Sequence, residues 1–131
     1  MEERLAQLEA AIHELERLRR LYSPDDVYRD RHLDWALRYG LLEAIQIVID
    51  VSCHLAARRN LGAPASYAEC IRLLRKAGLL DEALASTLVR MVGLRKILVH
   101  EYANVDVARL YGLLDQLDDF RRFAEQVHPL L

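Results

Sequence analysis

Glycine, proline and aromatic residues are scarce in this chain, and their scarcity narrows the fold class. Its 131 residues include 5 glycines and 3 prolines, and aromatic residues make up only 7%. Alanine, leucine, arginine and glutamate dominate instead, which favours helices over strands. We therefore expect an all-α protein. A chain of this length supplies one hydrophobic core, so we expect a single domain over residues 1–131.

An excess of positive charge is also missing. The chain carries 18 lysines and arginines against 20 aspartates and glutamates, a formal net charge of −2. This balance excludes the global basic field that drives nonspecific nucleic-acid binding, so local clusters would have to hold any nucleic acid. Such clusters are most often solvated helix faces. They are Arg17, Arg19 and Arg20, then Arg58 and Arg59, then Arg72, Arg75 and Lys76, and finally Arg121 and Arg122.

Cysteine and long apolar runs are equally sparse. The two cysteines, Cys53 and Cys70, lack the C-x-x-C spacing of metal sites and lie beside apolar residues in helical patterns. We expect reduced core thiols, as in a cytosolic protein. The first residues, 1–4, do not form a signal peptide, and no uninterrupted apolar stretch is long enough to span a bilayer. These observations predict a cytoplasmic protein without a membrane partner.

Helical spacing of apolar residues predicts a compact bundle of about five helices, one of them short. The second helix is apolar on more than one face from Leu41 to Val51, so we expect it to pack against several helices or a second subunit, with Gly40 as its weak point. The predicted helices cover residues 2–22, 24–59, 67–77, 82–102 and 107–128; Ser23, Ser66, Asp81 and Asp106 are expected to cap the last four, and Gly78 to follow the third.

Several enzyme classes are excluded by motifs that the chain lacks. It contains no P-loop, no dinucleotide-binding fingerprint and no nucleophile elbow. Asp50 and His54 are one helical turn apart, as are Glu9 and His13, but neither pair belongs to the paired Glu-x-x-His motifs of di-iron bundles. We therefore expect neither a metal nor a cofactor.

One charged residue interrupts the apolar face of the fourth predicted helix. Arg95 falls in phase with leucines and a methionine, and a guanidinium there must be paired, reach solvent, or line a cleft or interface. With His100 it could act on a phosphodiester, because histidine moves protons near neutral pH and arginine stabilises charge on phosphate oxygens. RNA is the natural substrate for such a pair, since its 2′-hydroxyl can attack the adjacent phosphorus.

Helical geometry limits this hypothesis. Five residues rotate by about 140° and rise by about 7.5 Å, so Arg95 and His100 do not share a face, whereas Arg95 and Tyr102 nearly do. Either the helix frays near His100, or a cleft wraps around its end, or a dimer axis brings two copies together. A structural role is the alternative, in which Arg95 pairs with a carboxylate and the basic residues interact with the helix dipole.

The segment 95–102 reads R-x4-H-x-Y and resembles the signature of the HEPN superfamily, in its HepT-like branch. Further similar segments are residues 35–41, 44–50, 64–69 and 91–94, so the resemblance covers residues 31–120. It implies a helical homodimer that acts as the metal-independent endoribonuclease toxin of a toxin–antitoxin pair, with Arg95 and His100 as the catalytic residues. The sequence departs from the family at Lys96, where asparagine or another small polar residue is common; lysine changes reach and hydrogen-bonding capacity there.

The same resemblance implies a partner and a means of control. HepT-like toxins are neutralised by MntA, a minimal nucleotidyltransferase antitoxin that transfers AMP from ATP to the motif tyrosine, here Tyr102. AMP on this hydroxyl would place a phosphate and a base beside Arg95 and compete with an RNA phosphate. A different class of function also fits the sequence: a noncatalytic dimeric helical module that engages a nucleotidyltransferase or nucleic acid.

Overall fold

The computed structural model describes residues 1–100 and 106–131, and within these ranges all regular structure is helical. The predicted all-α class is therefore confirmed. In chain order the helices are α1 (Glu2–Leu21), α2 (Pro24–Arg29), α3 (Arg31–Arg58), α4 (Tyr67–Lys76), α5 (Glu82–His100), α6 (Val107–Gly112) and α7 (Leu117–Val127), with 3₁₀ turns η2 (Leu113–Gln116) and η3 (His128–Leu130).

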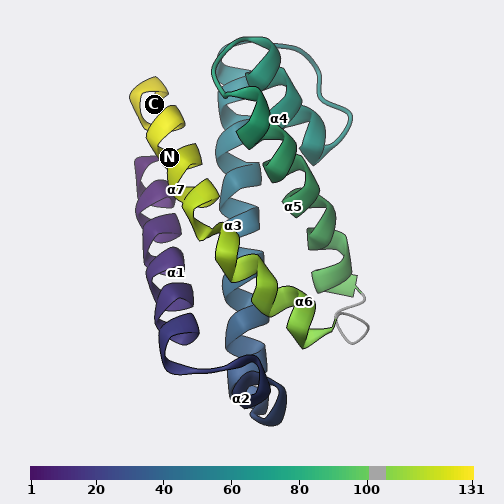
Figure 1. Cartoon of the computed structure of the whole chain (residues 1–131). Helices are drawn as coiled ribbons and strands as arrows, with labels where there is room; N and C mark the ends of the chain where they lie inside the picture. The colour runs from purple at the N-terminus through teal and green to yellow at the C-terminus, as the bar shows by residue number, and fades with distance from the viewer. Residues whose placement is uncertain (101–105) are drawn as a thin grey trace.

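The long helix α3 forms the centre of the bundle (Figure 1). It packs against α1 on one side and against α4 and α5 on the other, and α7 crosses in front of it. Its buried residues occupy several faces, as predicted for the segment from Leu41 to Val51. The helix continues without interruption through Gly40, where a Cβ atom would lie 2.7 Å from the Leu15 Cδ2 atom of α1. This glycine is therefore a place of close helix approach.

By length and composition, α3 is also the one helix among the described residues that could cross a membrane. The relevant 18-residue window has a mean hydropathy of 1.5, but 56% of that window is buried inside the bundle. A core helix surrounded by other helices has this same composition.

The predicted single helix over residues 24–59 is wrong at one point, because the chain breaks between α2 and α3. Asp30 adopts an extended conformation, with φ −114° and ψ 110°, and its carboxylate accepts a hydrogen bond from the His32 amide. An aspartate can compete for backbone amides in this way, ending one helix and capping the next. The predicted start at Ser23 is confirmed, with a reciprocal capping box between Ser23 and Asp26.

The predicted single helix over residues 107–128 is wrong as well. The chain turns through η2 between α6 and α7. The helix is interrupted there; α6 packs against α2 and α3, and α7 packs against α1, α3 and α5.

Three other predicted helix starts and one predicted helix end agree with the structure. The Ser66 hydroxyl accepts from the Glu69 amide, the Asp81 carboxylate accepts from the Leu84 amide, and the Asp106 carboxylate accepts from the Ala108 amide. Gly78 follows α4 with φ +78°, and the Leu79 amide reaches back to the Leu74 carbonyl. These are the bonds of a Schellman ending, which needs a left-handed residue at this position.

The two cysteines are paired, so the prediction of reduced thiols is wrong. A disulfide joins Cys53 of α3 to Cys70 of α4, with a Cα–Cα distance of 4.9 Å. The bond closes a loop between residues that are 17 positions apart, which sequence spacing alone does not indicate. The pairing also removes the reduced-thiol argument for a cytosolic protein.

Candidate active site

The apolar face predicted for α5 is present, and Arg95 interrupts it. Leu84 and Leu88 are fully buried, and Met91 and Leu98 are 4% and 6% exposed. Arg95 itself is half-buried. The helix therefore carries the guanidinium to the edge of the core, where water is partly excluded and charge interactions are stronger than at an open surface.

Uncharged groups hold Arg95 in place. Its Nε atom donates to the Oε1 atom of Gln46 on α3 at 2.6 Å, and its guanidinium carbon lies 5.2 Å from the ring centroid of Tyr67 on α4. Such a cation–π contact orients an arginine without neutralising it. Among the described residues no carboxylate forms an ion pair with Arg95, so its positive charge remains available to a ligand.

Gln46 is oriented in turn by a chain of polar contacts across the bundle. Its Nε2 atom donates to Asp50 Oδ1 at 2.8 Å, and Asp50 Oδ2 accepts from Arg4 of α1 at 2.5 Å. Because Nε2 faces the carboxylate, Oε1 faces Arg95. Gln46 and Tyr67 were not predicted as partners of Arg95. The one sequence signal for Gln46 was its position one helical turn before Asp50 within an apolar segment.

His100 lies at the other side of α5, exposed at the end of the helix. The helix remains regular from Arg95 through His100, so fraying before His100 does not bring the two side chains together. They leave the helix about 140° apart. A cleft around the helix end or a second copy of the chain is therefore needed for both to reach one phosphate. Tyr102, the predicted modification site, lies outside the described residues.

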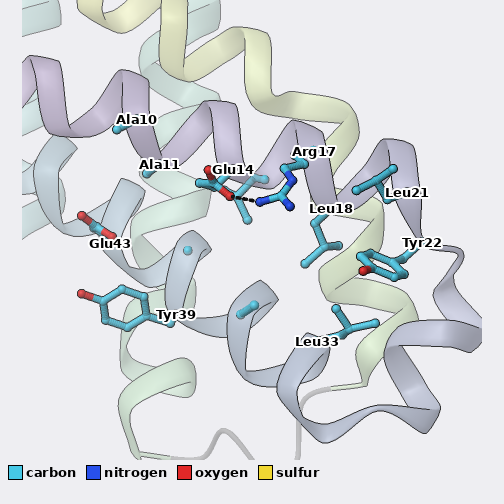
Figure 2. A pocket seen from close by; sticks show the side chains of 13 residues that line it. Ala10, Ala11, Glu14, Arg17, Leu18, Leu21, Tyr22, Leu33, Tyr39 and Glu43 are labelled. Carbon is cyan, nitrogen blue, oxygen red and sulfur yellow. Dashed lines mark hydrogen bonds and ion pairs between the residues drawn. The ribbon is translucent and has the colours of Figure 1, made fainter.

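A groove between α1 and α3 is separate from these residues (Figure 2). It has a volume of about 460 Å³ and an apolar floor that includes Leu15, Leu18 and Leu33. The charged pair at its rim, Glu14 and Arg17, is exposed. The groove includes neither Arg95 nor His100, and its lining gives no net positive charge for a phosphate.

The groups whose pKa values are shifted also lie away from Arg95 and His100. The hydrogen bond from Arg121 lowers the pKa of Glu16, where α7 meets α1. The hydrogen bond from Gln126, followed by that from the Leu84 amide, lowers the pKa of Asp81 before α5. These shifts belong to contacts that hold the bundle together. In the part of the chain that the structure describes, no group of three or more His, Cys, Asp or Glu side chains could hold a metal ion.

The helical fold and the R-x4-H spacing on α5 define a HEPN-type protein, and comparisons with known proteins narrow this class. The family model Ribonuclease HepT-like matches residues 8–127. The mRNA nuclease HepT of Shewanella oneidensis is 28% identical over 116 residues, 86% of each chain. A putative RNase of Archaeoglobus fulgidus is 35% identical over 94 residues, 71% of this chain and 70% of its own.

A solved structure agrees with these matches. The tri-AMPylated HEPN toxin of Shewanella oneidensis, in complex with an MNT antitoxin, has a TM-score of 0.88 and 23% identity, and the match covers 97% of this chain and 95% of that one. The chain belongs to the HepT-like ribonuclease family. The predicted HEPN fold and the predicted enzyme class, a ribonuclease, are thereby confirmed.

Proposed function

We propose that this ribonuclease is the toxin of a toxin–antitoxin pair and cleaves RNA with Arg95 and His100, without a metal ion. The observation that carries the proposal is the environment of Arg95. Its guanidinium is half-buried, fixed by Gln46 and Tyr67, and free of any carboxylate among the described residues. A preorganised positive charge of this kind stabilises negative charge that develops on a phosphate.

The reaction that fits these groups is attack by the neighbouring 2′-hydroxyl of RNA. The 2′-oxygen forms a bond to phosphorus while the bond from phosphorus to the 5′-oxygen breaks. One proton leaves the 2′-hydroxyl and one is added to the departing 5′-oxygen, and His100 serves as general base or general acid for these transfers. Arg95 stabilises the nonbridging oxygens. The products are a 2′,3′-cyclic phosphate and a 5′-hydroxyl end.

The separation of Arg95 and His100 on α5 supports a homodimer as the active form. Each site would then take Arg95 from one protomer and His100 from its partner. Mixing an Arg95→Ala protein with a His100→Ala protein tests this arrangement, because a mixed dimer would contain one intact site. Half of the dimers are mixed after exchange, so about one quarter of the parental activity should return. Two inactive variants that stay inactive after exchange would contradict a shared site.

We also propose that a nucleotidyltransferase antitoxin neutralises the protein by transferring AMP to Tyr102, and that both partners act in the cytoplasm. The AMPylated state and MNT partner of the similar Shewanella oneidensis toxin support this proposal. Incubation with the cognate nucleotidyltransferase and ATP should add the mass of AMP to the chain and abolish cleavage. The Tyr102→Phe protein should gain no such mass; an equal adduct on it would place the modification elsewhere.

The catalytic proposal is tested with purified protein in excess chelator. RNA should be cut to 2′,3′-cyclic phosphate ends, and Arg95→Ala and His100→Ala should each lose about 100-fold or more in kcat/KM. Arg58→Ala and His54→Ala are matched controls, since both side chains are exposed on the C-terminal part of α3. Undiminished cleavage by the His100→Ala protein would exclude the mechanism. A protein that binds its partner but cuts no RNA would instead be the noncatalytic module.

A further inference from the structure

A second hollow, between α4 and α5, differs from the groove of Figure 2 in its charge. It has a volume of about 310 Å³, and three arginines line it: Arg72 and Arg75 from α4, and Arg90 from α5. Glu82 is the one acidic residue in its lining within the part of the chain that the structure describes. We refer to this hollow as the α4–α5 groove. In a chain whose net charge is −2, it is a local concentration of positive charge.

The three arginines remain available to a ligand. All are exposed, and Arg72 forms an ion pair with Glu69 at 3.6 Å, with both side chains open to solvent by 40% or more. Such exposed pairs contribute little and open readily. Arg90 donates to the Thr87 hydroxyl at 3.3 Å, a contact that leaves its charge intact.

The α4–α5 groove is continuous with the surface of α5 that leads to His100. Ser86, which lines the groove, is followed at intervals of seven residues by Gly93 and His100. Seven residues fall about 20° short of two full turns, so the three lie along one side of the helix. Val89 and Lys96 have the same spacing and lie beside them. We call these five residues the α5 strip.

The α5 strip is accessible along its length. Ser86, Gly93, Lys96 and His100 are exposed, and Val89 is half-buried. A Cβ atom added at Gly93 would meet no other atom within 4 Å, so the helix backbone lies open between the groove and Lys96. From Ser86 to His100 the helix rises by about 21 Å, and at one phosphate per about 3.4 Å of a stacked strand this span accommodates about six phosphates.

We propose that the α4–α5 groove and the α5 strip bind the phosphate backbone of single-stranded RNA and guide it to His100. This inference rests on the proposed ribonuclease activity and adds the path of the substrate. Among the described residues, no aromatic side chain lines the groove. The described lining therefore offers no ring for base stacking, and the groove would hold phosphates without distinguishing sequence.

Binding is measured first, in a His100→Ala background that prevents cleavage, with a single-stranded RNA of about 20 nucleotides. Changing Arg72, Arg75 and Arg90 together to alanine should weaken binding equally for RNAs of different sequence. Each lost phosphate contact reduces the slope of log affinity against log salt by about 0.7, so three contacts reduce it by about 2. Raising salt from 50 to 200 mM should then weaken the parent about 16-fold more than the triple variant.

The matched control changes Arg17, Arg20 and Arg58, three exposed arginines on α1 and at the end of α3, to alanine. It removes the same charge and should retain the parental salt slope. An equal loss of slope in both triple variants would mean that net charge alone attracts RNA, and an unchanged slope in the first would mean that RNA follows another path. Either result overturns the proposal.

Cleavage with His100 intact separates this proposal from the catalytic one. The loss in kcat/KM caused by the Arg72, Arg75 and Arg90 changes should be at least about tenfold greater for the long RNA than for a trinucleotide, which cannot reach the groove. Equal losses for both lengths would overturn the path while leaving the chemistry in place. A parent protein that binds RNA with the expected difference in salt slope from the triple variant, and yet cuts neither RNA, would overturn the catalytic proposal alone.

Discussion

Replacing Gln46 by glutamate tests whether Arg95 must keep its charge free. The substitution preserves the shape of the side chain and an oxygen acceptor for the Arg95 Nε atom, now 2.6 Å from Gln46 Oε1. The new carboxylate would pair with the guanidinium and compete with an RNA phosphate for it. A charge-assisted hydrogen bond contributes about 1.5–3 kcal/mol where water is largely excluded. Because Arg95 is only half-buried, we expect the competing carboxylate to reduce transition-state stabilisation by about 1–2 kcal/mol. This corresponds to a loss of about 5- to 30-fold in kcat/KM.

The stability of the Gln46→Glu protein should change in a different way from its activity. The new carboxylate gains an ion pair with Arg95. The hydrogen bond that Gln46 donates to Asp50 is lost, and the two carboxylates then repel each other. These effects oppose one another, so the free energy of unfolding in urea should change by no more than about 1 kcal/mol. Gln46→Leu, by contrast, removes the acceptor without adding charge and should cost both stability and activity.

Gln126→Glu is the matched control. Gln126 Nε2 also donates to an aspartate, Asp81, at 2.7 Å, so the same change of charge occurs beside a carboxylate that does not belong to the Gln46–Asp50–Arg4 contacts. Its kcat/KM should stay within about twofold of the parent, because Asp81 and Arg95 are about 21 Å apart along the helix and salt screens charges at that separation. Parental cleavage by the Gln46→Glu protein would refute the inference that a free Arg95 charge is needed.

Two further predictions concern the stability of the bundle. Cys53→Ser should lower the free energy of unfolding by roughly 3 kcal/mol through the 17-residue loop that the disulfide closes, as urea titration measures; reductant should destabilise the parent but not the variant, and an equal response would contradict the disulfide. Acid should also destabilise the protein. In the folded state the hydrogen bond from Arg121 lowers the pKa of Glu16 below its ordinary value of 4.5. The stability that Glu16 contributes is therefore fully present above pH 4.5 and is lost as the pH falls through the lowered pKa of the folded state. Glu16→Gln should flatten this acid dependence, and an unchanged dependence would show that other carboxylates carry it.

The helix ends show which features of the fold are determined by a few neighbouring residues. Ser66 and Asp81 could be predicted as caps because the atoms they bind lie within three residues of them. The break at η2 could not be predicted in this way, because no side-chain hydrogen bond from the described residues caps η2 or α7. The break at Asp30 had a local signal, an aspartate able to cap, but the apolar periodicity on either side concealed it.

For the candidate site, the sequence indicated individual residues but not the contacts between them. A charge on an apolar face made Arg95 a candidate from sequence, and the chemistry of a nearby histidine added His100 independently of the family motif. The contact between Arg95 and Gln46 joins residues 49 positions apart, and Tyr67 reaches Arg95 from a third helix. Contacts of this kind depend on how α3, α4 and α5 pack, so helical periodicity alone cannot reveal them.

The two sides of α5 differ in their surroundings, and this difference bears on how an antitoxin could regulate the protein. Arg95 faces Gln46 and Tyr67, whereas the α5 strip that ends at His100 faces outward. Under the proposed control by AMPylation of Tyr102, the added phosphate would compete with RNA for Arg95. The α4–α5 groove does not include Arg95 in its lining, so its three arginines would keep their charge in the modified protein. If both proposals hold, antitoxin modification would abolish cleavage while the modified protein still retained RNA along α5, and the phosphate path and the chemical step would be controlled separately.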